Sequence, residues 1–158
     1  MLLRALVAFV ALPGVVALAI PAIIVANSSS ASLHPTASAP VALGLCGLVW
    51  CVRDFYVIGK GTLAPWSPPR HLVTTGMYRY SRNPMYLSVP LVLLGWSGLF
   101  ATLPLLVYAL VVAVAFHLRV TRFEEPWLAR VYGSAWSVYV QQVPRWLGVR
   151  LRHRGRDA

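Results

Sequence analysis

Long uncharged stretches alternate along this chain with short segments that carry nearly all of its charge. No Asp, Glu, Lys or Arg occurs in residues 5–52, and none occurs in residues 83–118. A helix that crosses a membrane needs about 20 mostly apolar residues. The first stretch has room for two such helices around the polar segment 27–40, and the second for two short or tilted ones joined by a tight turn at 96–104. The pattern predicts membrane-spanning helices at 4–26, 40–58, 85–100 and 103–120.

The composition agrees with a membrane protein. Of the 158 residues, 58% are hydrophobic and 11% are charged, whereas a typical soluble domain carries about 25% charged residues. The first apolar run is longer than the core of a signal peptide, so we expect it to remain as a span. We therefore expect an all-α integral membrane bundle of about four helices that forms a single domain over residues 1–158.

The positive charges predict the orientation of this bundle. The segments 27–40 and 96–104 contain no Lys or Arg, whereas the segment 53–82 and the tail after residue 118 together contain every Lys and Arg of the chain except Arg4. Basic loops stay on the cytoplasmic side of a membrane. Both termini are then cytoplasmic, which four spans also require, and a bacterial inner membrane is the expected location.

Two further classes of partner are not expected. Part of the net charge of +10 lies in the arginine-rich tail 145–158. In a membrane protein, a basic tail typically contacts anionic lipid headgroups rather than nucleic acid. Cys46 and Cys51 show no disulfide or zinc spacing, and the histidines are scattered. The sequence therefore predicts contact with membrane lipid, but neither a nucleic-acid partner nor a metal site.

Polar chemistry is concentrated in two segments, 72–86 and 119–146, on the predicted cytoplasmic side. The third and fourth predicted helices form an antiparallel hairpin, so their cytoplasmic ends must be neighbours. We therefore expect Arg82 and Tyr86 to face Arg119, Glu124 and Glu125 across a short distance.

Glu124 and Glu125 are two of only four acidic residues in the chain. Adjacent carboxylates repel each other and need cationic partners or a cationic ligand to stay ionised. One interpretation is an interfacial salt-bridge cluster, with Pro126 in the first turn of a helix. The candidate cationic partners are Arg79, Arg82, Arg119 and Arg122.

The other interpretation is a binding site. The helix expected after Asn83 and Pro84 offers free backbone N–H groups to an anion, and Arg82 adds a forked cation beside them. Aromatic faces that can stack on a base or attract a cation come from Tyr78, Tyr80 and Tyr86. Together with the glutamates, these groups suit a ligand with a carboxylate, a positive centre and an aromatic ring, such as S-adenosylmethionine.

The two segments resemble the integral-membrane methyltransferases of the isoprenylcysteine carboxyl methyltransferase and phospholipid methyltransferase group. The resemblance covers about residues 60–146. The first family motif, roughly G-x-Y-x-x-x-R-H/N-P-x-Y, is matched by Gly76, Tyr78, Arg82, Asn83, Pro84 and Tyr86. The second, a Glu-Glu pair followed by aromatic residues and Val-Pro-Arg, is matched by Glu124, Glu125, Leu128, Tyr132, Gly133, Trp136, Tyr139, Val143, Pro144 and Arg145.

This resemblance implies a cytosolic pocket for S-adenosylmethionine built from segments 60–86 and 119–146, with a C-terminal interfacial helix. It implies methyl transfer to a carboxylate or amine of a lipidic or prenylated acceptor, with Arg82 and Glu125 as catalytic residues. Where many members have histidine this chain has Asn83, which can hydrogen-bond but carries no titratable proton. The implied cofactor-binding residues are Leu72, Val73, Gly76, Tyr78, Arg82, Asn83, Tyr86, Glu124 and Glu125.

Two alternatives stay open at this stage. Membrane reductases of the sterol type carry a similar polar segment before a span and use NADPH, although this chain is short for them. The second alternative is a non-enzymatic scaffold or a small transporter subunit. Transport usually requires ionisable residues within the spans, and the interiors of the predicted spans hold almost none. The sequence leaves the methyl acceptor, the choice between O- and N-methylation, and the oligomeric state undetermined.

Overall fold

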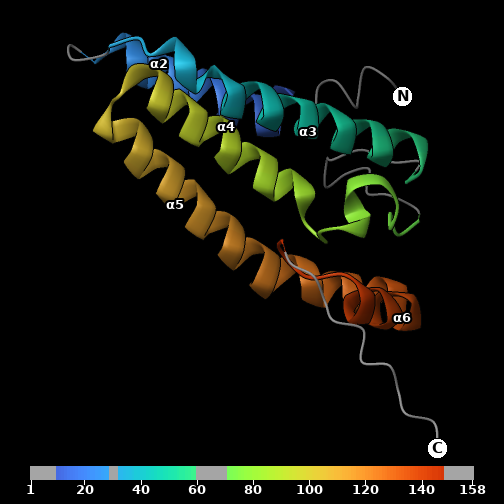
Figure 1. The fold of residues 1–158 in the computed structure, drawn as a ribbon. Helices are drawn as coiled ribbons and strands as arrows, with labels where there is room; N and C mark the ends of the chain where they lie inside the picture. The colour runs from blue at the N-terminus through green and yellow to red at the C-terminus, as the bar shows by residue number, and fades with distance from the viewer. Residues whose placement is uncertain (1–9, 29–31, 60–70, 148–158) are drawn as a thin grey trace, which may run out of the picture.

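The computed structural model describes residues 10–28, 32–59 and 71–147 (Figure 1). The regular elements within these ranges are all helical, as expected. The first helix begins as a π-helix, η1 (Val10–Ala19), and continues as α2 (Ile20–Ala26); the predicted residues 4–9 lie outside the described ranges. The bounds predicted for the other three helices are correct to within two residues. These helices are α3 (Ser38–Val57), α4 (Pro84–Phe100) and α5 (Leu103–Arg119).

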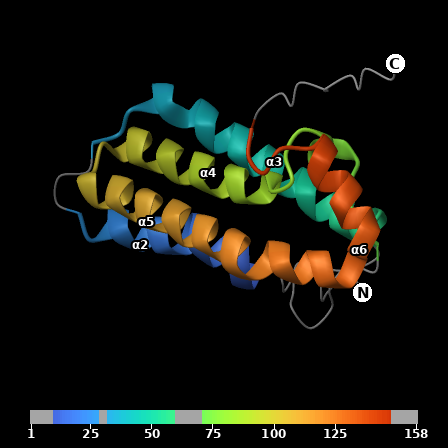
Figure 2. The same ribbon diagram turned by 90° about the horizontal axis from the view of Figure 1, so that it is seen from below.

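The helix α4 occupies the middle of the bundle, with α3 on one side and α5 on the other (Figures 1 and 2). The first helix packs against both α4 and α5, and the Tyr108 hydroxyl donates a hydrogen bond to the Val16 carbonyl at 3.1 Å. Side chains from all four helices form the main apolar core, which includes Ala17, Leu48, Val89, Val92, Leu93, Ala109 and Val112.

Glycines allow α3 and α4 to approach each other backbone to backbone. A β-carbon on Gly44 would lie 2.8 Å from the Ser88 carbonyl oxygen and 2.9 Å from the Val92 amide nitrogen. On the opposite helix, a β-carbon on Gly95 would lie 2.7 Å from the Val41 amide nitrogen. Small residues at such crossings are typical of helix pairs in membranes.

The turn between α4 and α5 lies within the predicted segment 96–104, at the two residues that the predicted helix bounds left between them. Only Ala101, in the left-handed conformation at φ 48°, and Thr102 separate the two helices. Near the end of α4, Trp96 and Phe100 stack one turn apart, with ring centroids at 5.4 Å. Two amides of the loop before α3 cap the end of α4: those of Ser32 and His34 donate to the carbonyls of Phe100 and Leu99 at 3.2 Å and 2.6 Å.

Beyond α5 the chain stays helical through a π-turn, η4 (Val120–Glu124), into α6 (Glu125–Gln142). Pro126 lies in the first turn of α6, as expected, although no loop precedes it. The direction changes at Gly133, whose backbone is not helical (φ 51°, ψ −119°). The last part of α6 therefore turns back toward the ends of α3 and α4 (Figure 2).

Among the described residues, two continuous helical stretches are long and apolar enough to cross a membrane by length and composition. One is Pro35–Asp54, which includes most of α3, and the other is Leu103–Gln142, which runs from α5 through η4 into α6. The apolar helices Pro13–Ala26 and Pro84–Phe100 are shorter. The outer face of α5 exposes a row of large apolar side chains: Leu103, Val107, Leu110, Val111 and Val114. Contiguous apolar surface of this kind marks a contact with lipid or with another protein.

Candidate functional site

Two arginines share one glutamate where the start of α4 meets the start of α6. Arg82 donates from Nη1 to Glu125 Oε1 at 2.8 Å. Arg145 donates from Nε to Oε1 at 2.9 Å and from Nη2 to Oε2 at 2.7 Å. The Arg82 side chain is 6% exposed and that of Glu125 14%, so little water screens their interaction. The Arg82 guanidinium also lies 5.6 Å from the centroid of the Trp136 ring, within the range of a cation–π contact.

A second cluster lies around the neighbouring glutamate. The Tyr86 hydroxyl donates a hydrogen bond to Glu124. Arg119 donates from Nε to the same carboxylate at 2.8 Å and to the Tyr86 oxygen at 3.2 Å. The Tyr86 ring is fixed by an edge-to-face contact with Phe116, at 4.7 Å between centroids. The expectation that Arg82 and Tyr86 face Arg119 and the glutamates is therefore confirmed.

Main-chain contacts hold the two polar segments together. The Arg82 amide donates to the Pro144 carbonyl at 2.9 Å. The Ser81 hydroxyl and the Asn83 side-chain amide both donate to the Arg145 carbonyl, at 3.2 Å and 3.1 Å. The segment 143–146 thus lies against the turn that starts α4, and the side chains of Ser81 and Asn83 are fixed there.

The remaining predicted residues lie apart from the glutamates. Val73 and Tyr78 are buried with Cys51 in a separate cluster. Gly76 adopts φ +59°, and a β-carbon there would collide with the buried carboxylate of Asp54. The Asp54 Oδ2 atom has no hydrogen-bond partner among the described residues. Gly76 is therefore required both for its left-handed backbone and for the space it leaves beside Asp54.

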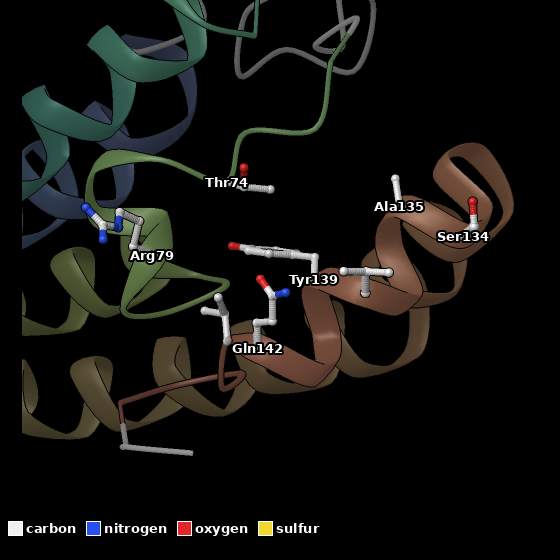
Figure 3. A pocket seen from close by; sticks show the side chains of 8 residues that line it. Thr74, Arg79, Ser134, Ala135, Tyr139 and Gln142 are labelled. Atoms are coloured by element: carbon white, nitrogen blue, oxygen red, sulfur yellow. The ribbon is translucent and has the colours of Figure 1, made fainter. Parts of the chain in front are cut away.

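An open pocket of about 610 Å³ lies between the segment before α4 and the last part of α6, and Tyr139 and Val143, which pack with Trp136, form part of its wall. Figure 3 shows the Tyr139 ring projecting from α6 toward the segment that carries Thr74 and Arg79. The Tyr139 hydroxyl donates to the Tyr78 carbonyl at 2.7 Å and so ties α6 to that segment. The volume is within the usual range for a small-molecule site. The lining residues are Thr74, Arg79, Ser134, Ala135, Val138, Tyr139, Gln142 and Val143.

Two protonation states are favoured by the surroundings. The hydrogen bond to Glu125 raises the pKa of Arg145, so this guanidinium stays charged. Burial raises the pKa of Tyr139, although the charge of Arg82 acts in the opposite direction. Tyr139 therefore remains a neutral phenol at physiological pH and can donate to the Tyr78 carbonyl.

The structure brings together five of the nine predicted cofactor residues: Arg82, Asn83, Tyr86, Glu124 and Glu125. Leu72 packs against the apolar cluster of Trp136, Tyr139 and Val143, but none of the nine lines the 610 Å³ pocket. Of the four arginines expected to balance the glutamates, Arg82 and Arg119 do so, whereas Arg79 lines the pocket and Arg122 is exposed.

Sequence reasoning missed the contact of Arg145 with Glu125 and the position of Arg82 over Trp136. Both depend on the reversal of the chain at Gly133. The one signal in the sequence is the glycine itself, because a glycine within a helical pattern is compatible with a positive φ that other residues avoid.

A comparison with known families identifies the chain. The sequence profile of the phospholipid methyltransferase family matches residues 37–135, more than half of the chain. This range includes both glutamates and the segment before α4, and it ends before Arg145. No curated protein and no solved structure resembles the chain closely enough to count as a match. The family agrees with the group to which the two polar motifs were compared. The chain belongs to the phospholipid methyltransferase family.

Proposed function

We propose that this protein transfers a methyl group from S-adenosylmethionine to a lipidic or prenylated acceptor at the cytosolic surface of a membrane. The observation that supports this proposal best is the contact between Arg82 and Glu125, next to the cluster of Tyr86, Glu124 and Arg119. Forked cations and carboxylates lie side by side there, at the ends of apolar helices. Membership of a methyltransferase family gives the reaction class.

The side chains present fit S-adenosylmethionine. Its carboxylate requires a cation, its amino group and ribose require acceptors, and its adenine requires an aromatic or apolar surface. Guanidinium, carboxylate and aromatic groups all occur within these clusters, and the adjoining pocket of about 610 Å³ offers room for a nucleoside. Tyr139 forms part of the wall of the pocket. Its hydrogen bond to the Tyr78 carbonyl also connects that wall to the segment that precedes α4.

We assign the binding roles by charge. Arg82 would hold the carboxylate of the cofactor, because a guanidinium can bind a carboxylate through two parallel hydrogen bonds. Glu124 or Glu125 would accept hydrogen bonds from the amino group or the ribose. Both glutamates already hold arginines, so binding would share or exchange these contacts. The remaining proposed cofactor residues are Leu72, Val73, Gly76, Tyr78, Asn83 and Tyr86.

S-adenosylmethionine supplies an activated methyl group on a sulfonium centre, so the main task of the protein is to position the reactants and exclude water. A carboxylate acceptor needs no general base. An amine acceptor must be neutral to react, and a glutamate or a water molecule would take its proton. In this scheme Glu125 acts in cofactor binding, through its contacts with Arg82 and Arg145.

The acceptor would enter sideways between helices, because its hydrocarbon tail is soluble in the bilayer core. This route requires a bundle of four spans in one domain, with the clusters at the cytosolic end and both termini in the cytoplasm. The exposed apolar row on α5 supports a lipid-facing surface. On the outer side of η4 and α6, Phe123, Trp127 and Val131 are exposed at four-residue spacing, which supports an interfacial helix.

Calorimetry with the full chain purified in detergent tests the proposal. Micromolar binding of S-adenosylmethionine and of S-adenosylhomocysteine is expected, together with loss of both on Arg82→Ala. Arg130→Ala, which changes an exposed arginine on α6, is the matched control and should bind as the parent does. Binding of NADPH instead of either ligand would overturn the proposal in favour of a reductase, and binding of none of the three, repeated in lipid nanodiscs, would also contradict it.

A further inference from the structure

We propose that Arg145 is a positioning residue of the cofactor site, which fixes the carboxylate of Glu125 and, through it, the guanidinium of Arg82. This inference rests on the proposed function, because the ligand whose binding it affects is S-adenosylmethionine. Arg145 lies beyond the part of the chain that the family profile matches, and its effect on the site depends on the reversal of the chain at Gly133.

The side-chain geometry assigns different roles to the two arginines. Arg145 holds both oxygens of Glu125 at once, and Arg82 donates from Nη1 to Oε1. A carboxylate bound through two parallel hydrogen bonds cannot rotate freely about the bond that joins it to the rest of the side chain. The orientation of Oε1, which contacts Arg82, is therefore set by Arg145.

Three hydrogen bonds and one ring contact hold Arg145 in place independently of its side chain. Its carbonyl accepts hydrogen bonds from Ser81 and Asn83, and the preceding carbonyl of Pro144 accepts one from the Arg82 amide. The following residue, Trp146, stacks on His117 of α5 at 5.9 Å between ring centroids. Truncation of the Arg145 side chain should therefore leave the segment 143–146 in position but loosen Glu125 and, through it, Arg82 and the turn 81–83 that carries it.

The balance of charge explains why Glu125 needs a second cation. One carboxylate between two guanidiniums leaves the group with a net charge of one positive. When the carboxylate of a ligand binds Arg82, that net charge is neutralised, and Arg145 still pairs with the Glu125 carboxylate. The Arg145 side chain is 39% exposed whereas that of Arg82 is 6% exposed, so Arg145 is accessible at the rim and Arg82 is enclosed.

Binding and hydrogen exchange of the full chain in detergent test this inference. Arg145→Ala should weaken the binding of S-adenosylhomocysteine by about tenfold or more, the loss expected for one charge-assisted hydrogen-bonded contact. Arg145→Lys restores the charge but not the fork, so its affinity should lie between those of Arg145→Ala and the parent. Hydrogen exchange should become faster at the amides of residues 81–83 in Arg145→Ala. Arg130→Ala is the control and should match the parent in both measurements.

The outcomes separate this inference from the proposed function. Parent-like affinity and parent-like exchange in Arg145→Ala would overturn the positioning role even if the parent binds the cofactor well. Equal loss in Arg145→Ala and Arg145→Lys, with a lowered thermal midpoint and unchanged exchange at 81–83, would indicate a contribution to folding only and would also overturn it. If the parent binds no cofactor, the proposed function fails, and the exchange comparison alone then decides whether Arg145 orders the 81–83 turn.

Discussion

Glu124 and Glu125 are adjacent in the sequence, yet their surroundings differ in ways that separate their energetic contributions. Glu125 is 14% exposed and bonds two guanidiniums, one of them almost fully enclosed. Glu124 is 29% exposed, and its partner Arg119 is 58% exposed. An exposed ion pair contributes little to stability, whereas removal of one member of a buried pair leaves an uncompensated charge. The two glutamates should therefore respond unequally to the same substitution.

Glu125→Gln should abolish binding of S-adenosylhomocysteine and lower the free energy of unfolding by about 2–3 kcal/mol, because Arg82 loses its counter-ion in a site with little water. Glu124→Gln should lower it by at most about 1 kcal/mol, because water screens the Arg119 partner. Denaturation of both variants in detergent micelles, with calorimetry on the folded fraction, measures the two effects. Equal destabilisation by the two substitutions, or intact binding in Glu125→Gln, would contradict this assignment.

At the scale of elements, the length of the uncharged apolar stretches predicted the helices well, but it did not predict the irregularities between them. The bounds of α3, α4 and α5 follow from where apolar runs meet Pro84, Ala101 and the charged residues at 119–125. The π-turn at Val120–Glu124 has no such signal, since it differs from an α-helix only in hydrogen-bond spacing. The reversal at Gly133 likewise depends on contacts made elsewhere in the chain. These two features orient the glutamates and return Arg145 to them.

The positive φ of Gly133 provides a direct test of the role of the chain reversal at this residue. A β-carbon at Gly133 would meet nothing within 4 Å, so Gly133→Ala introduces conformational strain without a steric clash. The strain of a non-glycine residue at such a φ is about 1–3 kcal/mol. Gly133→Ala should lower stability by that amount and weaken cofactor binding, since the last part of α6 carries Tyr139 and leads to Arg145. Arg130→Ala, at an exposed position on α6 outside the pocket lining, is the control, and parent-like stability of Gly133→Ala would show that the turn tolerates a side chain.

At the scale of the whole molecule, the sequence predicted which ends of the bundle meet. A tight turn between α4 and α5 requires Arg82 and Tyr86 to approach the glutamates, and this argument needs only the order of apolar and charged segments. Contacts that depend on the fit of three segments were not predictable in this way. Asp54 against Gly76 is one example, because a buried acid at the end of α3 looks like any charged residue at a helix end. Tyr139 against the Tyr78 carbonyl is another.

The number of spans decides on which side of the membrane this site lies. The 17 residues of α4 extend about 25 Å, somewhat less than the hydrocarbon core of about 30 Å. Whether α4 crosses the membrane is therefore the part of the four-span arrangement to test first. Thr36, before α3, and Ser134, in α6, are both exposed. If α3, α4 and α5 all cross, cysteines placed at these two positions lie on opposite sides; if α4 does not cross, they lie on the same side.

Labelling of right-side-out membrane vesicles with a membrane-impermeant maleimide distinguishes the two arrangements. The parent carries Cys46→Ser and retains Cys51, which is buried, and unlabelled parent is the baseline. If the basic segments lie in the cytoplasm, as the positive-inside rule predicts, Thr36→Cys should react in intact vesicles, whereas Ser134→Cys should react only after permeabilisation. Reaction of both cysteines from the same side would show that α4 does not cross the membrane. The opening of the bundle to lipid, and with it the sideways entry of a lipidic acceptor, would then need a different explanation.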